Sequence, residues 1–189
     1  MTTLPDTSLK AWRPPMGWNS WDSYGTTITE DEVLANARFM AEHLKAAGWD
    51  TLVIDAGWFD PNAHAHGYSD GTPLCIDEYG RQLPDERRFP SSAEGKGFGP
   101  LADAVHELGL KLGVHVMRGI PRQAVHENLP VKDTDLTARD VADTEHNCVW
   151  NHDNYGLKRG DAGAQAWYDA QVDLFASWGL DFLKVDDMQ

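Results

Sequence analysis

The sequence predicts an α/β fold built on a parallel sheet, because one pattern occurs three times along the chain. Residues 43–55, 104–116 and 173–186 each read as the end of an amphipathic helix, then a glycine, then a short apolar strand. A glycine suits the left-handed backbone at a helix C-terminus. Nearly continuous apolar strands are typical of a parallel sheet that is covered on both faces.

Four strands are expected, with a helix before each of the last three. They lie near residues 16–20, 51–55, 111–116 and 182–186. Strands and helices that alternate in this way form a parallel sheet with right-handed crossovers. Residues 1–13 are expected to be a leader ahead of the first strand.

The helices have local signals of their own. Thr29 and Glu32 form a capping-box pattern that predicts the start of the first helix. The apolar residues of this helix recur at helical spacing: Val33, Ala37, Met40 and Leu44. In the last helix, Trp167 and Trp178 are expected to pack against the sheet as core residues.

Two architectures use such a sheet, and the residues around the strands favour one of them. A nucleotide-binding sheet carries a glycine fingerprint after its first strand, whereas residues 19–25 read NSWDSYG. Polar or aromatic residues stand instead at the four strand ends: Trp18, Asp55, His115 and Asp186. In a (β/α)8 TIM barrel these ends form the floor of the active site, and a complete barrel takes about 250 residues. Residues 1–189 are therefore expected to be a partial barrel of about the first four β/α units.

The composition argues against several classes of protein. The 16 Lys and Arg against 30 Asp and Glu give a net charge of −14, which disfavours nucleic acid as a partner because phosphate binding depends on basic residues. No apolar run approaches the roughly 18 residues that span a membrane. No signal-peptide pattern opens the chain, so a cytoplasmic protein is expected. Cys75 and Cys148 are too few for a disulfide framework and form no CxxC metal site.

Two strand ends carry residues that suit catalysis on a sugar. Strand alternation puts Lys184 and Asp186 on one face, and a carboxylate beside a lysine stays ionised, as a nucleophile should. Asp55 is followed closely by Trp58, and a carboxylate with an indole can bind the hydroxyls and the C–H face of a sugar. The alternative for both aspartates is an ordinary loop or capping residue at a strand end.

Histidines suggest a metal site, and a long segment suggests a lid, but neither signal is strong. His64 and His66 form an HxH pair in a polar loop rather than on a strand end, so they are expected at the surface and no metal is expected. His115 is expected to be a buried hydrogen-bonded histidine or a sugar contact. In the segment 118–154, Trp150, Asn151 and Asp153 fit a saccharide-facing lid and a purely structural loop equally well.

The motif PPMGWNSWDSYG at residues 14–25 resembles the opening of glycoside hydrolase family 27, the α-galactosidase or melibiase family. The resemblance continues, in the family's order and as far as residue 187, through AAGWDTLVIDAGW, GRQLPDERRFPS, LGLKLGVHV and FASWGLDFLKVDD. It implies a (β/α)8 catalytic barrel that hydrolyses α-linked sugars with retention, through a covalent glycosyl-enzyme intermediate and without a cofactor.

The resemblance also implies roles for individual residues. Asp186 matches the family's nucleophile. The residues that match or stand at its sugar-contacting positions are Trp18, Asp55, Trp58, His115 and Lys184. Many members have a tyrosine where this chain has His115. The acid/base residue is expected from a later strand, beyond Gln189, so the chain alone is expected to be inactive.

One departure from the family bears on the substrate. The usual Asp-Asp-Cys-Trp is replaced by Asp55-Ala56-Gly57-Trp58. Because the second aspartate normally holds sugar hydroxyls, Ala56 predicts a divergent branch with a different distal pocket. Two other hypotheses remain, a non-catalytic carbohydrate-binding module and a metal-dependent barrel hydrolase that uses His64, His66 and His115. The expected partner is a saccharide, and a homo-oligomer is compatible with the sequence.

Overall fold

A computed structural model describes residues 14–68 and 73–187, and the predicted leader at residues 1–13 lies outside the described residues. Four parallel strands form one sheet in the order β1-β2-β3-β7. They are β1 (Gly17–Asn19), β2 (Thr51–Ile54), β3 (Lys111–Met117) and β7 (Phe182–Asp186). All four lie where the sequence predicts strands. The α/β class and the parallel sheet are thus confirmed, while completion into a barrel stays a prediction.

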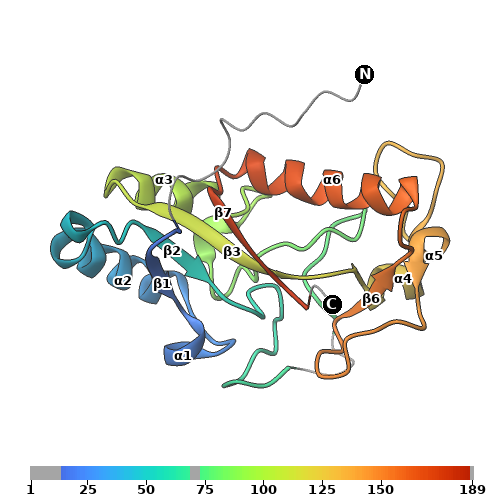
Figure 1. Cartoon of the computed structure of the whole chain (residues 1–189), viewed down its shortest axis with the longest axis horizontal. Helices are drawn as coiled ribbons and strands as arrows, with labels where there is room; N and C mark the ends of the chain where they lie inside the picture. The colour runs from blue at the N-terminus through green and yellow to red at the C-terminus, as the bar shows by residue number, and fades with distance from the viewer. Residues whose placement is uncertain (1–13, 69–72, 188–189) are drawn as a thin grey trace.

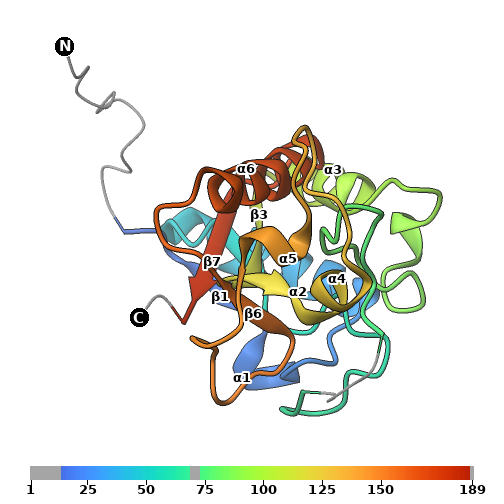
Figure 2. The same cartoon turned by 90° about the vertical axis from the view of Figure 1, so that its right-hand side faces the viewer.

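Helices α2 (Glu30–His43), α3 (Gly99–Glu107) and α6 (Ala162–Ser177) precede the last three strands of this sheet. Figures 1 and 2 show α3 and α6 lying along the sheet. The predicted capping box opens α2, since the side chains of Thr29 and Glu32 each accept the other's backbone N–H. Short helical turns complete this part: α1 (Trp21–Tyr24), Lys45–Ala47 and Pro90–Ser92. Among the described residues, no helix has the length and apolar character needed to cross a membrane.

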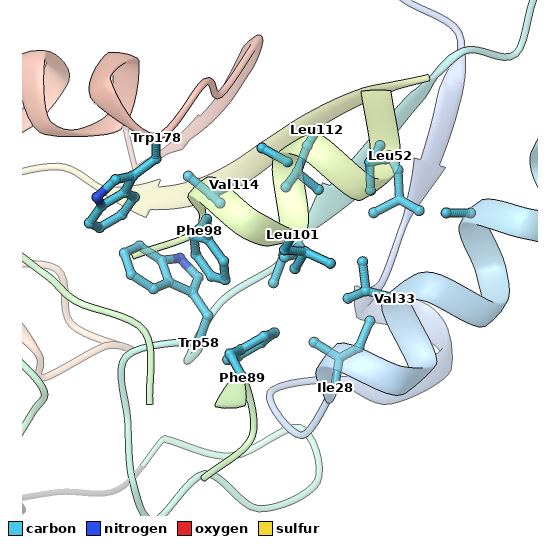
Figure 3. Close-up of a cluster of buried hydrophobic side chains, with 14 of the residues drawn as sticks. Ile28, Val33, Leu52, Trp58, Phe89, Phe98, Leu101, Leu112, Val114 and Trp178 are labelled. Carbon is cyan, nitrogen blue, oxygen red and sulfur yellow. The ribbon is translucent and has the colours of Figure 1, made fainter. Parts of the chain in front are cut away.

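The helices pack against one face of the sheet and bury its apolar side chains. The strand residues of this core alternate along β2 and β3: Leu52, Ile54, Leu112 and Val114. Trp178, predicted as core, is 5% exposed and lies close to Phe98, as Figure 3 shows. The opposite face of the sheet is therefore free to carry polar groups, and Asp55 and His115 lie there by alternation.

Residues 118–157 build a small unit of their own, which the sequence analysis left without secondary structure. Strands β4 (Ile120–Pro121), β6 (Asn154–Leu157) and β5 (Ala142–Asp143) form an antiparallel sheet in that order. Helices α4 (Arg122–Glu127) and α5 (Ala138–Val141) lie beside it at one end of the molecule (Figure 1). Trp167 of α6 is 4% exposed, which confirms its predicted burial, but it packs in the apolar core of this unit rather than against the parallel sheet.

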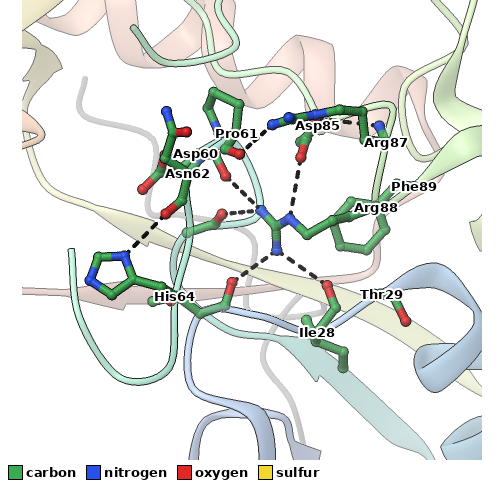
Figure 4. Close-up of polar contacts among 12 residues, drawn as sticks. Ile28, Thr29, Asp60, Pro61, Asn62, His64, Asp85, Arg87, Arg88 and Phe89 are labelled. Atoms are coloured by element: carbon green, nitrogen blue, oxygen red, sulfur yellow. Dashed lines mark hydrogen bonds and ion pairs between the residues drawn. The ribbon is translucent and has the colours of Figure 1, made fainter. Parts of the chain in front are cut away.

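Arg88 joins the segments that follow the first two strands. Its guanidinium donates to four main-chain carbonyls and one carboxylate, those of Thr26, Ile28, Gly57, Asp60 and Asp85. Figure 4 shows the guanidinium at the centre of these contacts. Because the Arg88 side chain is only 14% exposed, water cannot replace it as the donor to all of these oxygens. The loop after β2 is thereby held against the loop after β1.

We expect Arg88→Met to lower the free energy of unfolding of the complete protein by about 3–5 kcal/mol, because it removes the buried cation paired with Asp85 and the donor shared by four main-chain carbonyls. Arg87→Met is the matched control: Arg87 also pairs with Asp85, but its side chain is 67% exposed, so its loss should cost less than about 1 kcal/mol. Denaturant unfolding of both variants measures the difference. Equal losses would contradict the structural role assigned to Arg88.

Candidate active site

Asp55, His115 and Lys184 form a row across the polar face of the sheet. Lys184 lies directly opposite His115 in the β3–β7 register, and Asp55 follows β2 on the other side of β3. Lys184 Nζ donates to Asp55 Oδ2 at 2.6 Å, and Asn19 Nδ2 donates to the same oxygen at 2.7 Å. Side chains from β1 and β7 therefore converge on the carboxylate that follows β2.

The Asp55 carboxyl is ionised in spite of its position. Burial raises its pKa, but hydrogen bonds from Lys184 and from the Ala56 N–H, with smaller contributions from His115 and Asn19, outweigh burial and leave the pKa below its ordinary value. An ionised carboxylate is a strong acceptor for hydroxyl groups. Because the Asp55 side chain is only 3% exposed, it serves first to hold Lys184 and Asn19 in place.

Asp186 ends β7 beside this row. One carboxylate oxygen, Oδ1, accepts the Asp187 backbone N–H at 2.9 Å, and the other, Oδ2, lies 3.3 Å from His115 Nε2. His115 is 1% exposed, and burial lowers its pKa against the opposing effect of Asp55, so its imidazole is neutral at neutral pH. A neutral imidazole can donate to Asp186 only through a protonated Nε2. The Asp186 side chain itself is 43% exposed, so a substrate can reach it.

Trp58 corrects one of the sequence predictions. It was expected to contact the sugar, but its side chain is fully buried and packs in the core against Phe59, Phe98 and Phe175. The chain turns toward the core directly after β2, so the Trp58 indole lies away from the polar face of the sheet. Its Nε1 donates to the main-chain oxygen of His115 at 2.8 Å. Trp58 therefore supports the site indirectly, because it binds the main chain of the strand that carries His115.

Trp18 requires a similar correction. In the β1–β2 register it pairs with Leu52, and it packs against the same helix-side core as Leu52. Its side chain lies on the face of the sheet opposite to Asp55, so it is not placed to lie under a sugar ring there. Asn19, one residue later, points to the polar face and binds Asp55. Alternation along Gly17–Asn19 could have identified Asn19.

Trp21, Tyr68 and Trp150 form an aromatic wall, of which the sequence analysis named only Trp150, as a residue that fits a lid or a structural loop. Tyr68 stacks on Trp21 with ring centroids 6.3 Å apart and lies 5.9 Å from Trp150. The Tyr68 side chain also hydrogen-bonds Asn151. Trp21 begins α1, whereas Tyr68 and Trp150 lie in two loops that are remote in sequence, and no local pattern predicts such a contact. The segment around Trp150 and Asn151 thus reaches the site.

Tyr68 lies near the carboxylates of the candidate site. Burial and the negative charges of Asp55, Asp153 and Asp186 raise its pKa to about 12, although the hydrogen bond with Asn151 acts in the opposite direction. Its hydroxyl therefore stays protonated and available as a donor at any pH near neutrality. A sugar-binding site contains polar groups, such as Asp55, Lys184 and Asp186, together with an aromatic surface such as this wall.

His64 and His66, the other candidate metal ligands, lie on the loop after β2. The ring nitrogens make contacts with main-chain oxygens, His64 Nδ1 with Asn62 and His66 Nε2 with Trp21. Within residues 14–68 and 73–187, no group of three His, Cys, Asp or Glu side chains is arranged so that it could hold a metal ion.

Comparisons with known proteins identify relatives of this arrangement. A β-L-arabinopyranosidase of glycoside hydrolase family 27 from Geobacillus stearothermophilus is 56% identical, with a TM-score of 0.90. The match covers 92% of this chain and 40% of that enzyme. The chain is a homologue of family 27 enzymes. The resemblance that the motifs indicate is thus confirmed.

Other relatives of this family 27 homologue are α-galactosidases. That of Cyamopsis tetragonoloba is 29% identical over 177 residues, which are 93% of this chain and 30% of the relative. α-Galactosidase I of Mortierella vinacea is 26% identical, with a TM-score of 0.52, over 93% of this chain and 31% of that structure. No protein-family model matches the chain. The chain therefore spans well under half the length of these three glycosidases.

Proposed function

We propose that the complete protein is a retaining glycosidase that acts on α-linked sugars, with Asp186 as its nucleophile. The observation that carries this proposal is the state of the Asp186 carboxylate, which is open to solvent yet has one donor at each oxygen. It lies beside Lys184, which is paired with the buried Asp55 and whose partly exposed ammonium group can donate to hydroxyl groups. The α-galactosidases among the homologues support the substrate class.

The reaction proceeds in two displacements. An Asp186 oxygen bonds to the anomeric carbon while the glycosidic C–O bond breaks, and a second carboxylic acid gives its proton to the departing oxygen. Water then attacks the same carbon, its proton returns to the second carboxylate, and the bond to Asp186 breaks. Two inversions give net retention and restore both carboxyl groups.

The second carboxyl group is proposed to come from a part of the protein outside these residues. Asp55 is bound by Lys184, and Asp187 is bound by Arg118. A carboxylate that is paired with a cation stays ionised and is a poor proton donor. The relatives are two to three times longer than this chain, so the complete protein has room for the missing group. By itself, the chain is proposed to lack turnover.

The proposed sugar has the ring stereochemistry of α-D-galactose, which β-L-arabinopyranose shares while lacking the hydroxymethyl group. A variant of the Geobacillus stearothermophilus enzyme has been solved in complex with arabinose. Position 56, beside the Asp55 carboxylate, carries an alanine that offers no hydrogen bond to an extra hydroxyl. We therefore propose that β-L-arabinopyranosides are better substrates than α-D-galactosides.

The Asp186→Ala variant of the complete protein should lose at least about 10³-fold in kcat on an aryl glycoside, because the covalent intermediate cannot form. Asp173→Ala, which removes an exposed aspartate of α6, is the control and should keep wild-type kcat. NMR of the first product formed should show the anomeric configuration of the substrate. An inverted product, or an active Asp186→Ala variant, would refute the proposed mechanism.

We expect wild-type kcat/KM to be higher for 4-nitrophenyl β-L-arabinopyranoside than for 4-nitrophenyl α-D-galactopyranoside. Ala56→Asp should shift this ratio toward the galactoside by about 10–100-fold, the effect of one charge-assisted hydrogen bond. Ala56→Val is the matched control, because it adds bulk without an acceptor and should not favour the galactoside. An unchanged ratio in Ala56→Asp would contradict the role given to this position.

A further inference from the structure

Asp187, the residue after the proposed nucleophile, has a backbone conformation that aspartate rarely adopts. Its φ is +56°, in the left-handed region. The N–H of Asp187 lies in the peptide that joins it to Asp186, and it donates to Asp186 Oδ1 at 2.9 Å. Aspartate enters this region more readily than most residues other than glycine, and the contacts of the Asp187 side chain fix which conformation it takes.

Arg118, the residue directly after β3, holds the Asp187 side chain. Arg118 Nε donates to Asp187 Oδ2 at 2.8 Å, and the two side chains are 22% and 12% exposed. The Arg118 backbone N–H also donates to the main-chain oxygen of Asp186 at 3.3 Å. One residue at the end of β3 thus contacts both the residue that carries the nucleophile and the residue that follows it.

The antiparallel unit fixes Arg118 in turn. Arg118 Nη1 donates to the main-chain oxygen of His146 at 3.2 Å, and the buried Asn154 of β6 donates to the main-chain oxygen of Arg118 at 3.1 Å. Gly156 lies so close that a Cβ there would come within 3.3 Å of Arg118 Nη1. The guanidinium is therefore held between the 118–157 unit and the end of β7.

We infer that Arg118 is a positioning residue that aims the Asp186 carboxylate by anchoring Asp187, whose N–H donates to Asp186 Oδ1. This inference rests on the proposed nucleophilic role of Asp186. The Asp187 N–H and His115 Nε2 then fix the two carboxylate oxygens from opposite sides. Arg118 acts through Asp187, so its loss should slow attack on the anomeric carbon without weakening the binding of the sugar.

The test uses aryl glycoside kinetics of the complete protein. Arg118→Met should lower kcat about 10–100-fold, the effect of a misplaced reacting group, with KM within about threefold of wild type. The glycine in Asp187→Gly tolerates the backbone conformation but lacks the carboxylate that binds Arg118, so kcat should fall by a similar factor. Asp187→Asn keeps an acceptor for Arg118 and tolerates the left-handed region, so its loss should be smaller. In Arg118→Met/Asp187→Gly the losses should not multiply, because the residues act as one unit.

The control is Arg139→Met, which removes another arginine of the 118–157 unit. Arg139 donates to the main-chain oxygens of Val125 and His126 and should leave kcat unchanged. The inference is overturned if Arg118→Met or Asp187→Gly keeps wild-type kcat, if their losses multiply, or if Arg139→Met lowers kcat equally. Should Arg118→Met fail to fold, the two Asp187 variants decide. An active Asp186→Ala would instead refute the proposed nucleophile, so the two failures are distinguishable.

Discussion

The ion pair between Lys184 and Asp55 is the constraint on which the candidate site at the polar face of this sheet depends. It reaches from β7 to the end of β2 across β3, the strand that carries His115. Removal of the lysine would leave the Asp55 carboxylate buried at 3% exposure, and an uncompensated buried charge costs about 3–5 kcal/mol. The pair therefore fixes the spacing of the ends of β2 and β7, and the hydrogen bond from Asn19 ties the end of β1 to the same carboxylate.

The unit at residues 118–157 has two connections to the candidate site. Near one end of the unit, Arg118 binds Asp187 and so controls the backbone beside the proposed nucleophile. From its later part, Asn151 binds Tyr68 and helps to build the aromatic wall. A segment that carries its own apolar core can hold both contacts rigidly. This explains why a long connection between β3 and α6 is folded rather than irregular.

The sequence predicts the parts of this structure that depend on neighbouring residues. The Thr29–Glu32 capping box, the four strands and the shared face of Lys184 and Asp186 all follow from local spacing and recur in the structure. The misplaced residues depend on longer connections. Trp58 enters the core because the chain turns after β2, and Tyr68 meets Asn151 from another loop. Neither geometry leaves a periodic signal. Trp18 lies on the core face because alternation along the three residues of β1 places it beside Leu52.

The most direct test of the central claim is to locate the covalent intermediate. The complete protein would be treated with a 2-deoxy-2-fluoro glycosyl fluoride of the preferred sugar, digested and analysed by peptide mass spectrometry. The account predicts one equivalent of sugar on Asp186, formed at a rate that matches the loss of activity. A label on Asp55 or Asp187, or inactivation without any label, would contradict the claim that Asp186 is the nucleophile.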